Sequence, residues 1–341
     1  MRILVTGGAG FIGCNTVDRL LRRGAEVTIF DNLSRRGGRS NLEWLTAQHG
    51  QAAFRLIAAD LRQFDRLAEA ARGQDVILHL AGQVAVTTSV NDPRGDFEDN
   101  ALGTFNALEA ARLSGSGPIF LYASTNKVYG GMEEVALVEQ NTRYVYRDFP
   151  NGIPETQPLD FHSPYGCSKG AGDQYVRDYA RIYGLRTVVF RQSAIYGPRQ
   201  FGIEDQGWLA WFIIAAVTGK PITIYGDGKQ VRDVLYVADL IDLYEAAIQH
   251  IDRVSGQVFN AGGGPANTLS VWSEFGPLLE ELLGRAVQVG WGDWRPGDQR
   301  IYVSDIRTAK ELLSWSPRVA PAEGVLKLHE WVIANRALFE S

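Results

Sequence analysis

The sequence predicts an α/β protein: a doubly wound parallel sheet followed by a smaller, mixed α/β lobe at the C-terminal end. Over about the first 190 residues, short apolar runs alternate with longer amphipathic segments. This strand–helix alternation is typical of a doubly wound sheet. The apolar runs are continuous, as expected for parallel strands that are covered on both faces. After about residue 195 the pattern changes, which indicates the second lobe.

The order of the elements follows from these runs. Strands are expected over residues 3–6, 26–30, 53–58, 76–79, 119–123 and 187–190. Helices are expected near residues 11–23, 39–49, 62–72, 96–113, 165–183, 207–219, 237–250, 270–283 and 321–337. We therefore predict one domain over residues 1–195 and a lobe over residues 196–341, with some exchange of strands and helices between them. The polar, irregular stretch 131–163 is expected to surround the active site.

Charge and composition narrow the classes of protein. Lys and Arg number 34 against 39 Asp and Glu, so the formal net charge is −5, and no basic tract predicts binding to nucleic acid. No apolar run reaches about 18 residues, so no membrane span is expected, and the stretch 208–217 indicates a buried helix. Cys14 and Cys167 lie far apart, which predicts neither a structural disulfide nor a metal site. The sequence shows no charged leader followed by an apolar stretch, so no signal peptide is expected. Together with the two distant cysteines, this predicts a cytoplasmic protein.

A glycine-rich loop directly after the first expected strand indicates a dinucleotide site. Residues 6–13 are Thr-Gly-Gly-Ala-Gly-Phe-Ile-Gly, which contains the G-x-G-x-x-G spacing, and a helical pattern follows. Glycines allow a tight turn and let backbone N–H groups approach a pyrophosphate at the helix N-terminus. A glycine-rich turn without function is the alternative, but the order strand, loop, helix, strand and acid favours a Rossmann-type fold. The cofactor contacts expected here are Gly7, Gly10, Phe11, Ile12 and Gly13.

The second expected strand ends at Asp31, whose carboxylate is placed to accept both hydroxyls of an adenosine ribose. A carboxylate at this point repels a 2′-phosphate, so NAD is predicted as the cofactor in preference to NADP. Arg35 and Arg36 follow closely and would suit a phosphate, although solvated loop charge is the other interpretation. Asn32, Ser34 and Arg35 are included among the expected cofactor contacts.

Two further pairs of residues follow expected strands: Asp60-Leu61 after the third and Leu80-Ala81 after the fourth. Ligands of open α/β sheets bind at the carboxyl ends of the strands, so we predict that these residues contact the cofactor. Asp60 would serve equally well as the N-cap of a helix.

Tyr165 and Lys169 stand four residues apart at the start of an expected helix and therefore share one face. A free tyrosine has a pKa near ~10. A neighbouring ammonium and an oxidised nicotinamide would both favour the phenolate, which makes Tyr165 a candidate base for a substrate hydroxyl. The fifth strand ends in Ser124-Thr125, where a hydroxyl could bond the reacting oxygen. A surface helix pair and a hydroxyl that satisfies its own backbone are the alternatives.

An ordered set of motifs extends over essentially the whole chain. It comprises the glycine loop 6–13, Asp60-Leu61, His79-Leu80-Ala81-Gly82-Gln83, Asn100, Val128-Tyr129-Gly130, Tyr165 with Lys169, Tyr196-Gly197-Pro198-Arg199 and Arg232-Asp233. This set resembles the extended short-chain dehydrogenase/reductase family of nucleotide-sugar epimerases and dehydratases. The resemblance implies that Thr125 is the catalytic Ser/Thr, Tyr165 the base and Lys169 the lysine that holds the ribose. It also implies cofactor contacts at Gln83 and Asn100, and a homodimer or homotetramer.

Four longer segments, 124–130, 158–170, 202–208 and 225–237, are similar to the subfamily of CDP-tyvelose (CDP-paratose) 2-epimerases. That resemblance implies an isomerase that acts on a CDP-linked sugar by transient oxidation at C2 and return of the hydride to the opposite face. Ala194 departs from the subfamily pattern, in which a cysteine near the nicotinamide is expected. The exact sugar therefore stays open.

The nucleotide half of the substrate is expected in the C-terminal lobe. Arg232 and Arg295 are candidates for binding a diphosphate, because guanidinium forks match phosphate oxygens. Ordinary surface or interface salt bridges are the alternative. Gln192, Gln206 and Tyr225 are candidates for the sugar or base region.

Two other functions remain open from the sequence. The first is another reaction on the same scaffold, a 4-epimerase or a decarboxylase. A dehydratase is disfavoured, because Asn126-Lys127 follow Thr125 where dehydratases of the family usually carry Asp-Glu. The second, from another class, is an NAD(P)-sensing binding protein without turnover. Such a protein would be expected to lose Tyr165 or Lys169, and this chain has both.

Overall fold

The computed structural model describes residues 1–295 and 298–340, which form two compact units. The first unit consists of Met1–Val128, Phe161–Arg191 and Ile241–Phe259. The second consists of Tyr129–Asp160, Gln192–Leu240 and Asn260–Ser341. The sequence prediction places 129–160 in the N-terminal part and 241–259 in the C-terminal part. In the structure each of these two segments belongs to the other unit, so the chain passes between the units several times.

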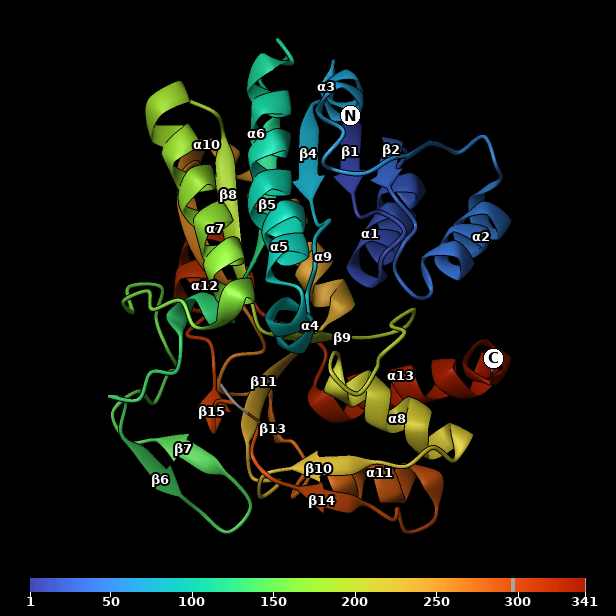
Figure 1. Cartoon of the computed structure of the whole chain (residues 1–341), viewed down its shortest axis with the longest axis vertical. Helices are drawn as coiled ribbons and strands as arrows, with labels where there is room; N and C mark the ends of the chain where they lie inside the picture. Colours follow the sequence, from blue (N-terminus) through green and yellow to red (C-terminus); the bar gives the residue numbers. More distant parts are fainter. Residues whose placement is uncertain (296–297, 341) are drawn as a thin grey trace. The chain divides into compact units, whose positions relative to one another are not determined.

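The first unit is built on a seven-stranded sheet in the order β12-β8-β5-β4-β1-β2-β3. Figure 1 labels β8, β5, β4, β1 and β2 of this sheet. Its strands are β1 Arg2–Thr6, β2 Glu26–Asp31, β3 Phe54–Ala58, β4 Val76–His79, β5 Ile119–Thr125, β8 Thr187–Gln192 and β12 Gln257–Ala261. The pairs β1–β2, β2–β3, β1–β4 and β4–β5 are all parallel. The strand order reverses between β1 and β4, and open α/β sheets bind their ligands at such a switch point.

Helices cover both faces of this sheet. They are α1 Phe11–Arg22, α2 Gly38–His49, α3 Phe64–Ala71, α4 Val86–Asn91, α5 Pro93–Asp96, the π-helix η1 Phe97–Leu102, α6 Gly103–Leu113, the 3₁₀ turn η2 Asn126–Tyr129, α7 Ser163–Tyr183, α9 Val237–Gln249 and α10 Ile251–Val254. Helices α3, α6 and α7 enclose a core that includes Val189 of β8. The neighbouring Phe190 points to the opposite face, where its ring packs 5.1 Å from that of Tyr244 in α9. The predicted doubly wound parallel sheet is confirmed.

The second unit combines short strands with an apolar helical core. Its strands are β6 Leu137–Glu139, β7 Tyr144–Tyr146, β9 Ala194–Tyr196, β10 Thr223–Tyr225, β11 Val231–Tyr236, β13 Thr268–Ser270, β14 Gly290–Gly292 and β15 Ile301–Tyr302. Its helices are α8 Trp208–Thr218, α11 Phe275–Leu283, α12 Arg307–Leu313 and α13 Pro321–Ala334, with the 3₁₀ turn η3 Arg336–Phe339. Helix α8 packs on α13, and its residues Leu209, Phe212 and Ile213 are buried. The predicted buried helix is thereby confirmed, and no helix of the described residues is long and apolar enough to cross a membrane.

The stretch predicted to be irregular, 131–163, contains a short antiparallel hairpin of β6 and β7, in which Leu137 pairs with Tyr146. Strands of three residues are too short to show the alternation of polar and apolar side chains by which strands are predicted.

Candidate active site

The glycine loop after β1 has a shape that larger residues cannot adopt. Gly7 has a φ of +70°, in the left-handed region. A Cβ at Gly13 would lie 2.1 Å from the carbonyl oxygen of Gly7, and a Cβ at Gly7 would lie 2.8 Å from the backbone nitrogen of Ala81. Gly10 is the N-cap of α1, so Phe11 and Ile12 begin the helix, and N–H groups at this end have no partner inside it. The loop is therefore a close-packed cradle of backbone donors at the switch point.

Asp31 is tied directly to this loop. Its Oδ2 accepts a hydrogen bond from the backbone N–H of Ala9 at 3.0 Å, and its Oδ1 accepts one from Leu33 at 2.8 Å. Burial raises the pKa of Asp31, and the two backbone hydrogen bonds oppose that rise. A carboxylate has about four lone-pair sites, so acceptor capacity is left for two hydroxyls. The cradle and the acid beside it fit the adenosine and pyrophosphate of NAD.

Asp60 follows β3 and lies in a network of hydrogen bonds. Its carboxylate accepts bonds from Arg62 Nε at 2.7 Å and from Asn32 Nδ2 at 2.9 Å. The hydrogen bonds from Arg62 hold the pKa of Asp60 well below its usual range. Asn32 in turn accepts from the Ser34 hydroxyl at 2.7 Å. The N-cap of the next helix, α3, is Gln63, so capping does not account for Asp60. Its contact with the cofactor stays a prediction.

The predicted residues after β4 lie close to the glycine loop. Leu80 donates its N–H to Thr6 O at 3.2 Å, and Ala81 N–H donates to Thr6 Oγ1 at 3.2 Å. Gln83 folds back onto the backbone of Ala85, while Leu61 is buried after β3. These contacts place the chain after β4 directly beside the cradle.

Asn100 lies on the π-helix η1 and is buried. Its Oδ1 has no hydrogen-bond partner within residues 1–295 and 298–340, and a Cβ at Gly82 would lie 2.4 Å from it. A buried acceptor without a partner points to a missing donor, as a bound ligand would supply. Single turns of π-helix are frequent at functional sites.

Tyr165 and Thr125 meet in the structure. Tyr165 is buried near the start of α7, and its hydroxyl is hydrogen-bonded to Thr125. Burial raises the pKa of Tyr165 to about 12, while the Thr125 hydrogen bond and the charge of Arg35 act to lower it. The hydroxyl of Ser124 instead donates to Asp173 at 3.0 Å. Of the two hydroxyls that end β5, the structure therefore places Thr125 beside the tyrosine.

Lys169, one helical turn after Tyr165, is also buried. Its Nζ lies 4.6 Å from the ring centroid of Tyr122. Burial lowers the pKa of Lys169 to about 8, and the charges of Asp96 and Asp173 oppose this effect. Neither carboxylate was identified from the sequence. Asp96 lies on α5 and meets Lys169 only in the folded chain, whereas Asp173 follows Lys169 by four residues on α7, a spacing that the sequence already shows. Both acids fall in predicted helical segments, and the four-residue spacing of Lys169 and Asp173 was the signal available for the second.

The residues predicted to hold the nucleotide sugar lie in the second unit, and three of them are connected. The guanidinium of Arg295 lies 3.8 Å from the ring centroid of Tyr225. Glu204 accepts from the Tyr225 hydroxyl at 2.9 Å, and its backbone oxygen accepts from Arg295 at 3.4 Å. Gln206 follows two residues later in the same loop, whose Ile203 and Gln206 exchange backbone hydrogen bonds.

Arg232 and Gln192 are placed differently. Arg232, on β11, donates to the carboxylate of Asp298 at 3.3 Å, so the ion pair considered as the alternative is present. Gln192 is buried at the end of β8. Residues Pro296 and Gly297, which follow Arg295, lie outside the described residues.

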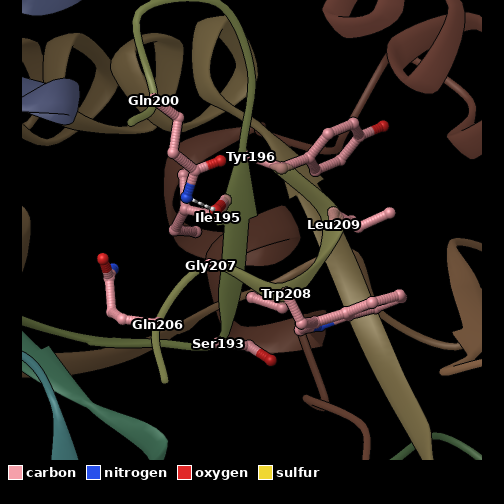
Figure 2. A pocket seen from close by; sticks show the side chains of 9 residues that line it. Ser193, Ile195, Tyr196, Gln200, Gln206, Gly207, Trp208 and Leu209 are labelled. Atoms are coloured by element: carbon pink, nitrogen blue, oxygen red, sulfur yellow. Dashed lines mark hydrogen bonds between the residues drawn. The ribbon is translucent and has the colours of Figure 1, made fainter. Parts of the chain in front are cut away.

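The second unit also contains a cavity of about 140 Å³. Figure 2 shows Ile195 and Tyr196 on β9 with Ser193 just before them. Gln206 lies in the loop that leads into α8, and Trp208 is the first residue of that helix. Ala194 contributes to the same lining. The cavity therefore joins one predicted substrate contact, Gln206, with the position at which this chain departs from the subfamily pattern.

Two polar atoms of the lining lack a hydrogen-bond partner among the described residues: Gln200 Oε1 and Trp208 Nε1. Gln200 donates its amide N–H to Ile195 O at 3.2 Å, which leaves the oxygen as an acceptor. Both atoms are buried within the wall of the cavity, so they are unsatisfied groups of the lining and do not identify a ligand.

Comparisons with known proteins place the chain in a family. A model of the NAD dependent epimerase/dehydratase family matches residues 3–262. CDP-paratose 2-epimerase of Salmonella typhi is 46% identical over 338 residues, which cover 97% of this chain and 99% of that protein.

Two crystal structures share the fold over nearly the whole length. UDP-glucose 4-epimerase of Thermotoga maritima with UDP-glucose has a TM-score of 0.83 at 30% identity, covering 98% of this chain and 100% of that one. UDP-glucuronic acid 4-epimerase of Bacillus cereus, in complex with UDP-glucuronic acid and NAD, also has a TM-score of 0.83, at 27% identity and with coverage of 98% and 100%.

These findings confirm the predicted family, the NAD cofactor and the class of enzyme, an NAD-dependent epimerase of nucleotide-linked sugars. They favour the enzyme over the binding protein without turnover. The chain belongs to the NAD dependent epimerase/dehydratase family.

Proposed function

We propose that this protein is a 2-epimerase of a CDP-linked sugar that converts CDP-paratose to CDP-tyvelose. The observation that carries the proposal is the 46% identity to a CDP-paratose 2-epimerase along essentially the entire length of both chains. The buried Tyr165, hydrogen-bonded to Thr125 and followed by Lys169, supplies the acid–base group that the reaction needs.

The first unit holds the cofactor. The glycine cradle at residues 7–13 binds the pyrophosphate, Asp31 binds the adenosine ribose, and Lys169 binds the second ribose. NAD held by these residues would supply the oxidant for the sugar carbon and the hydride for its later reduction. Asn100, with its unpaired Oδ1, is a further contact on this side. The remaining proposed contacts are Asn32, Ser34, Arg35, Asp60, Leu61, Leu80, Ala81 and Gln83.

Tyr165 removes the proton from the sugar hydroxyl at C2, and Thr125 orients that hydroxyl. In the chain alone, burial keeps the pKa of Tyr165 at about 12. A phenol with that pKa is a poor base near neutral pH, so the positive charge of the oxidised cofactor is needed to favour the phenolate. After the keto sugar has turned, Tyr165 returns the proton as the other face of C2 is reduced.

In the second unit, Arg232 and Arg295 bind the diphosphate, and Gln192, Gln206 and Tyr225 contact the sugar or the base. Arg295 is paired with Asp205 at 3.3 Å in this structure, so anion binding would replace one ion pair with another. Guanidinium groups suit this exchange because their donors match carboxylate and phosphate oxygens equally.

The test is the conversion of CDP-paratose that carries deuterium at C2, in ordinary water. Redox epimerisation returns the same hydrogen to the same carbon, so the product is expected to be inverted at C2 and to keep its deuterium. Loss of the label to water with inversion at C2 would refute the hydride mechanism and leave the substrate in place. Inversion at C4, or turnover of UDP-sugars alone, would instead support a 4-epimerase, the activity of the two structural relatives.

We also propose a homo-oligomer, a dimer or a tetramer, that pairs through helices α6 and α7. These helices pack side by side (Figure 1), and they expose the apolar residues Phe105, Leu113, Tyr175, Ile182 and Tyr183. A twofold axis through such a face would bury it against a second copy. Light scattering should give at least twice the mass of 37.6 kDa, and a Tyr175→Asp variant should shift the mass towards one chain. A wild-type protein that stays monomeric at micromolar concentration would exclude this arrangement.

The cytoplasm is the proposed location, since no disulfide is found between Cys14 and Cys167.

A further inference from the structure

A buried carboxylate beside the catalytic helix takes no part in the chemistry proposed above. Asp96 ends α5, where the chain passes into the π-helix η1, and it is 1% exposed. Its Oδ2 accepts a hydrogen bond from Ser168 Oγ at 2.5 Å, and its Oδ1 accepts one from Asn100 Nδ2 at 3.0 Å. Burying a charge is unfavourable unless the group is paired and hydrogen-bonded, so its place inside the unit needs an explanation.

The two hydrogen bonds join Asp96 to both halves of the predicted site. Ser168 precedes Lys169 on α7, and its hydroxyl also lies 3.2 Å from the carbonyl oxygen of Tyr165. Asn100 is held on the π-helical turn, and its Oδ1 has no hydrogen-bond partner in the described part of the chain. Helices α5 and η1 both pack on α7. One carboxylate therefore ties the helix that carries Tyr165 and Lys169 to the turn that carries Asn100.

The charge of Asp96 acts on both catalytic groups. Burial raises the pKa of Asp96, whereas the two hydrogen bonds and the Lys169 ammonium lower it; Asp92 acts in the opposite sense. The negative charge of Asp96 raises the pKa of Lys169 and also that of Tyr165.

Other groups face the same pair of residues. Asp173, on α7 itself, also raises the pKa of Lys169. Arg35 and Thr125 lower the pKa of Tyr165. His79 is buried, which lowers its pKa to about 3, so it contributes no charge near neutral pH.

We propose that Asp96 is a positioning residue for the Tyr165–Lys169 pair. Through Ser168 and Asn100 it fixes α7 against the π-helical turn, and its negative charge keeps the Lys169 ammonium protonated inside the protein. The role of Tyr165 and Lys169 in catalysis rests on the proposed function. The placement of Asp96 beside them and the effect of its charge on Lys169 do not.

Asp96→Asn removes the charge and keeps the shape and the acceptor oxygen. Asp99→Asn is the matched control, because it removes the same charge from the same π-helical turn at a half-buried position. Ser168→Ala removes the hydrogen bond and keeps the charge. Asp96→Glu keeps the charge and serves where Asp96→Asn does not fold.

The first measurement needs no substrate. Lysine labelled with ¹³C at Cε is titrated by NMR in the purified enzyme, and the Lys169 signal is assigned by its loss in Lys169→Arg. In the wild type the midpoint is expected near the pKa of about 8. Asp96→Asn is expected to lower it by about one pH unit, the lower end for a nearby charge. Asp99→Asn, Ser168→Ala and Asp96→Glu should shift it much less.

The second measurement is the dependence of kcat on pH with a turned-over nucleotide sugar. Loss of the Asp96 charge lowers the pKa of both Tyr165 and Lys169, so both limbs of the profile should move to lower pH. A merely structural role would lower kcat without moving the profile.

An unchanged Lys169 midpoint in Asp96→Asn, or an equal shift in Asp99→Asn, would overturn the proposal. A fall of the midpoint in Asp96→Glu as large as in Asp96→Asn would do the same. If the wild type converts no nucleotide sugar, the proposed function fails, and the NMR titration still decides this inference.

Discussion

A buried ion pair on the catalytic helix should make the first unit sensitive to the loss of either partner. Asp173 and Arg191 join α7 to β8, with Nε–Oδ2 and Nη2–Oδ1 distances of 2.9 and 3.1 Å. Their side chains are 0% and 3% exposed. Asp173→Asn would remove the counter-charge that Asp173 supplies to the buried Arg191 guanidinium.

The size of the effect follows from this burial. Removing one partner of a buried ion pair costs about 3–5 kcal/mol. A unit of this size loses roughly 2–4 °C in Tm for each kcal/mol, so Asp173→Asn should unfold on the order of 10 °C below the wild type. The combined change Asp173→Leu with Arg191→Met removes both charges and should restore much of the loss.

The assay is thermal unfolding followed by circular dichroism, with tryptophan fluorescence as a second probe because two units need not unfold together. Glu323→Gln is the control: it breaks the exposed pair of Glu323 and Lys327, which lies in the other unit. Exposed pairs contribute about 0–1 kcal/mol, so that variant should melt close to the wild type. If Asp173→Asn melts as Glu323→Gln does, the reasoning from burial is wrong.

Two further predictions concern the site itself. Tyr165→Phe should lower kcat by at least about a hundredfold, the lower end for a general base, while NAD measured in the purified protein stays bound; near wild-type turnover would refute the assigned base. Gly13→Ala should abolish the bound NAD that the wild type carries from purification, because the added Cβ would lie 2.1 Å from Gly7 O. The nucleotide released on denaturation, identified by chromatography, shows whether Tyr165→Phe keeps its NAD and whether Gly13→Ala has lost it. NADP alone in the wild type would contradict the assignment of NAD from Asp31.

Much of the fold could be predicted because its signals are local. The strands of the sheet are continuous apolar runs, and the glycine loop, Asp31 and the Tyr165–Lys169 spacing are patterns within short segments. The observed bounds of β1, β2, β4 and α1 lie within one residue of those expected. Each of these features depends on neighbours in the chain, which is why the sequence alone indicates them.

Other features depend on residues that are distant in the sequence. The hairpin of β6 and β7 has strands too short to show a period. The exchange of residues 129–160 and 241–259 between the units depends on which surfaces they pack against.

The sequence by itself determined the class of sheet, the cofactor loop, the candidate base Tyr165 and the candidate ribose-binding Lys169. The reason is that hydrophobic periodicity and motif spacing depend only on the order of residues along the chain. The residues alone left Thr125 and Ser124 open and the resemblance implied Thr125; the tertiary structure places Thr125 beside Tyr165 and turns Ser124 to Asp173. It also decided that Asp96, on α5, lies beside Lys169. The physical reason is that burial and the approach of charges are set by side chains from different elements, and their strength depends on distance and solvent exclusion.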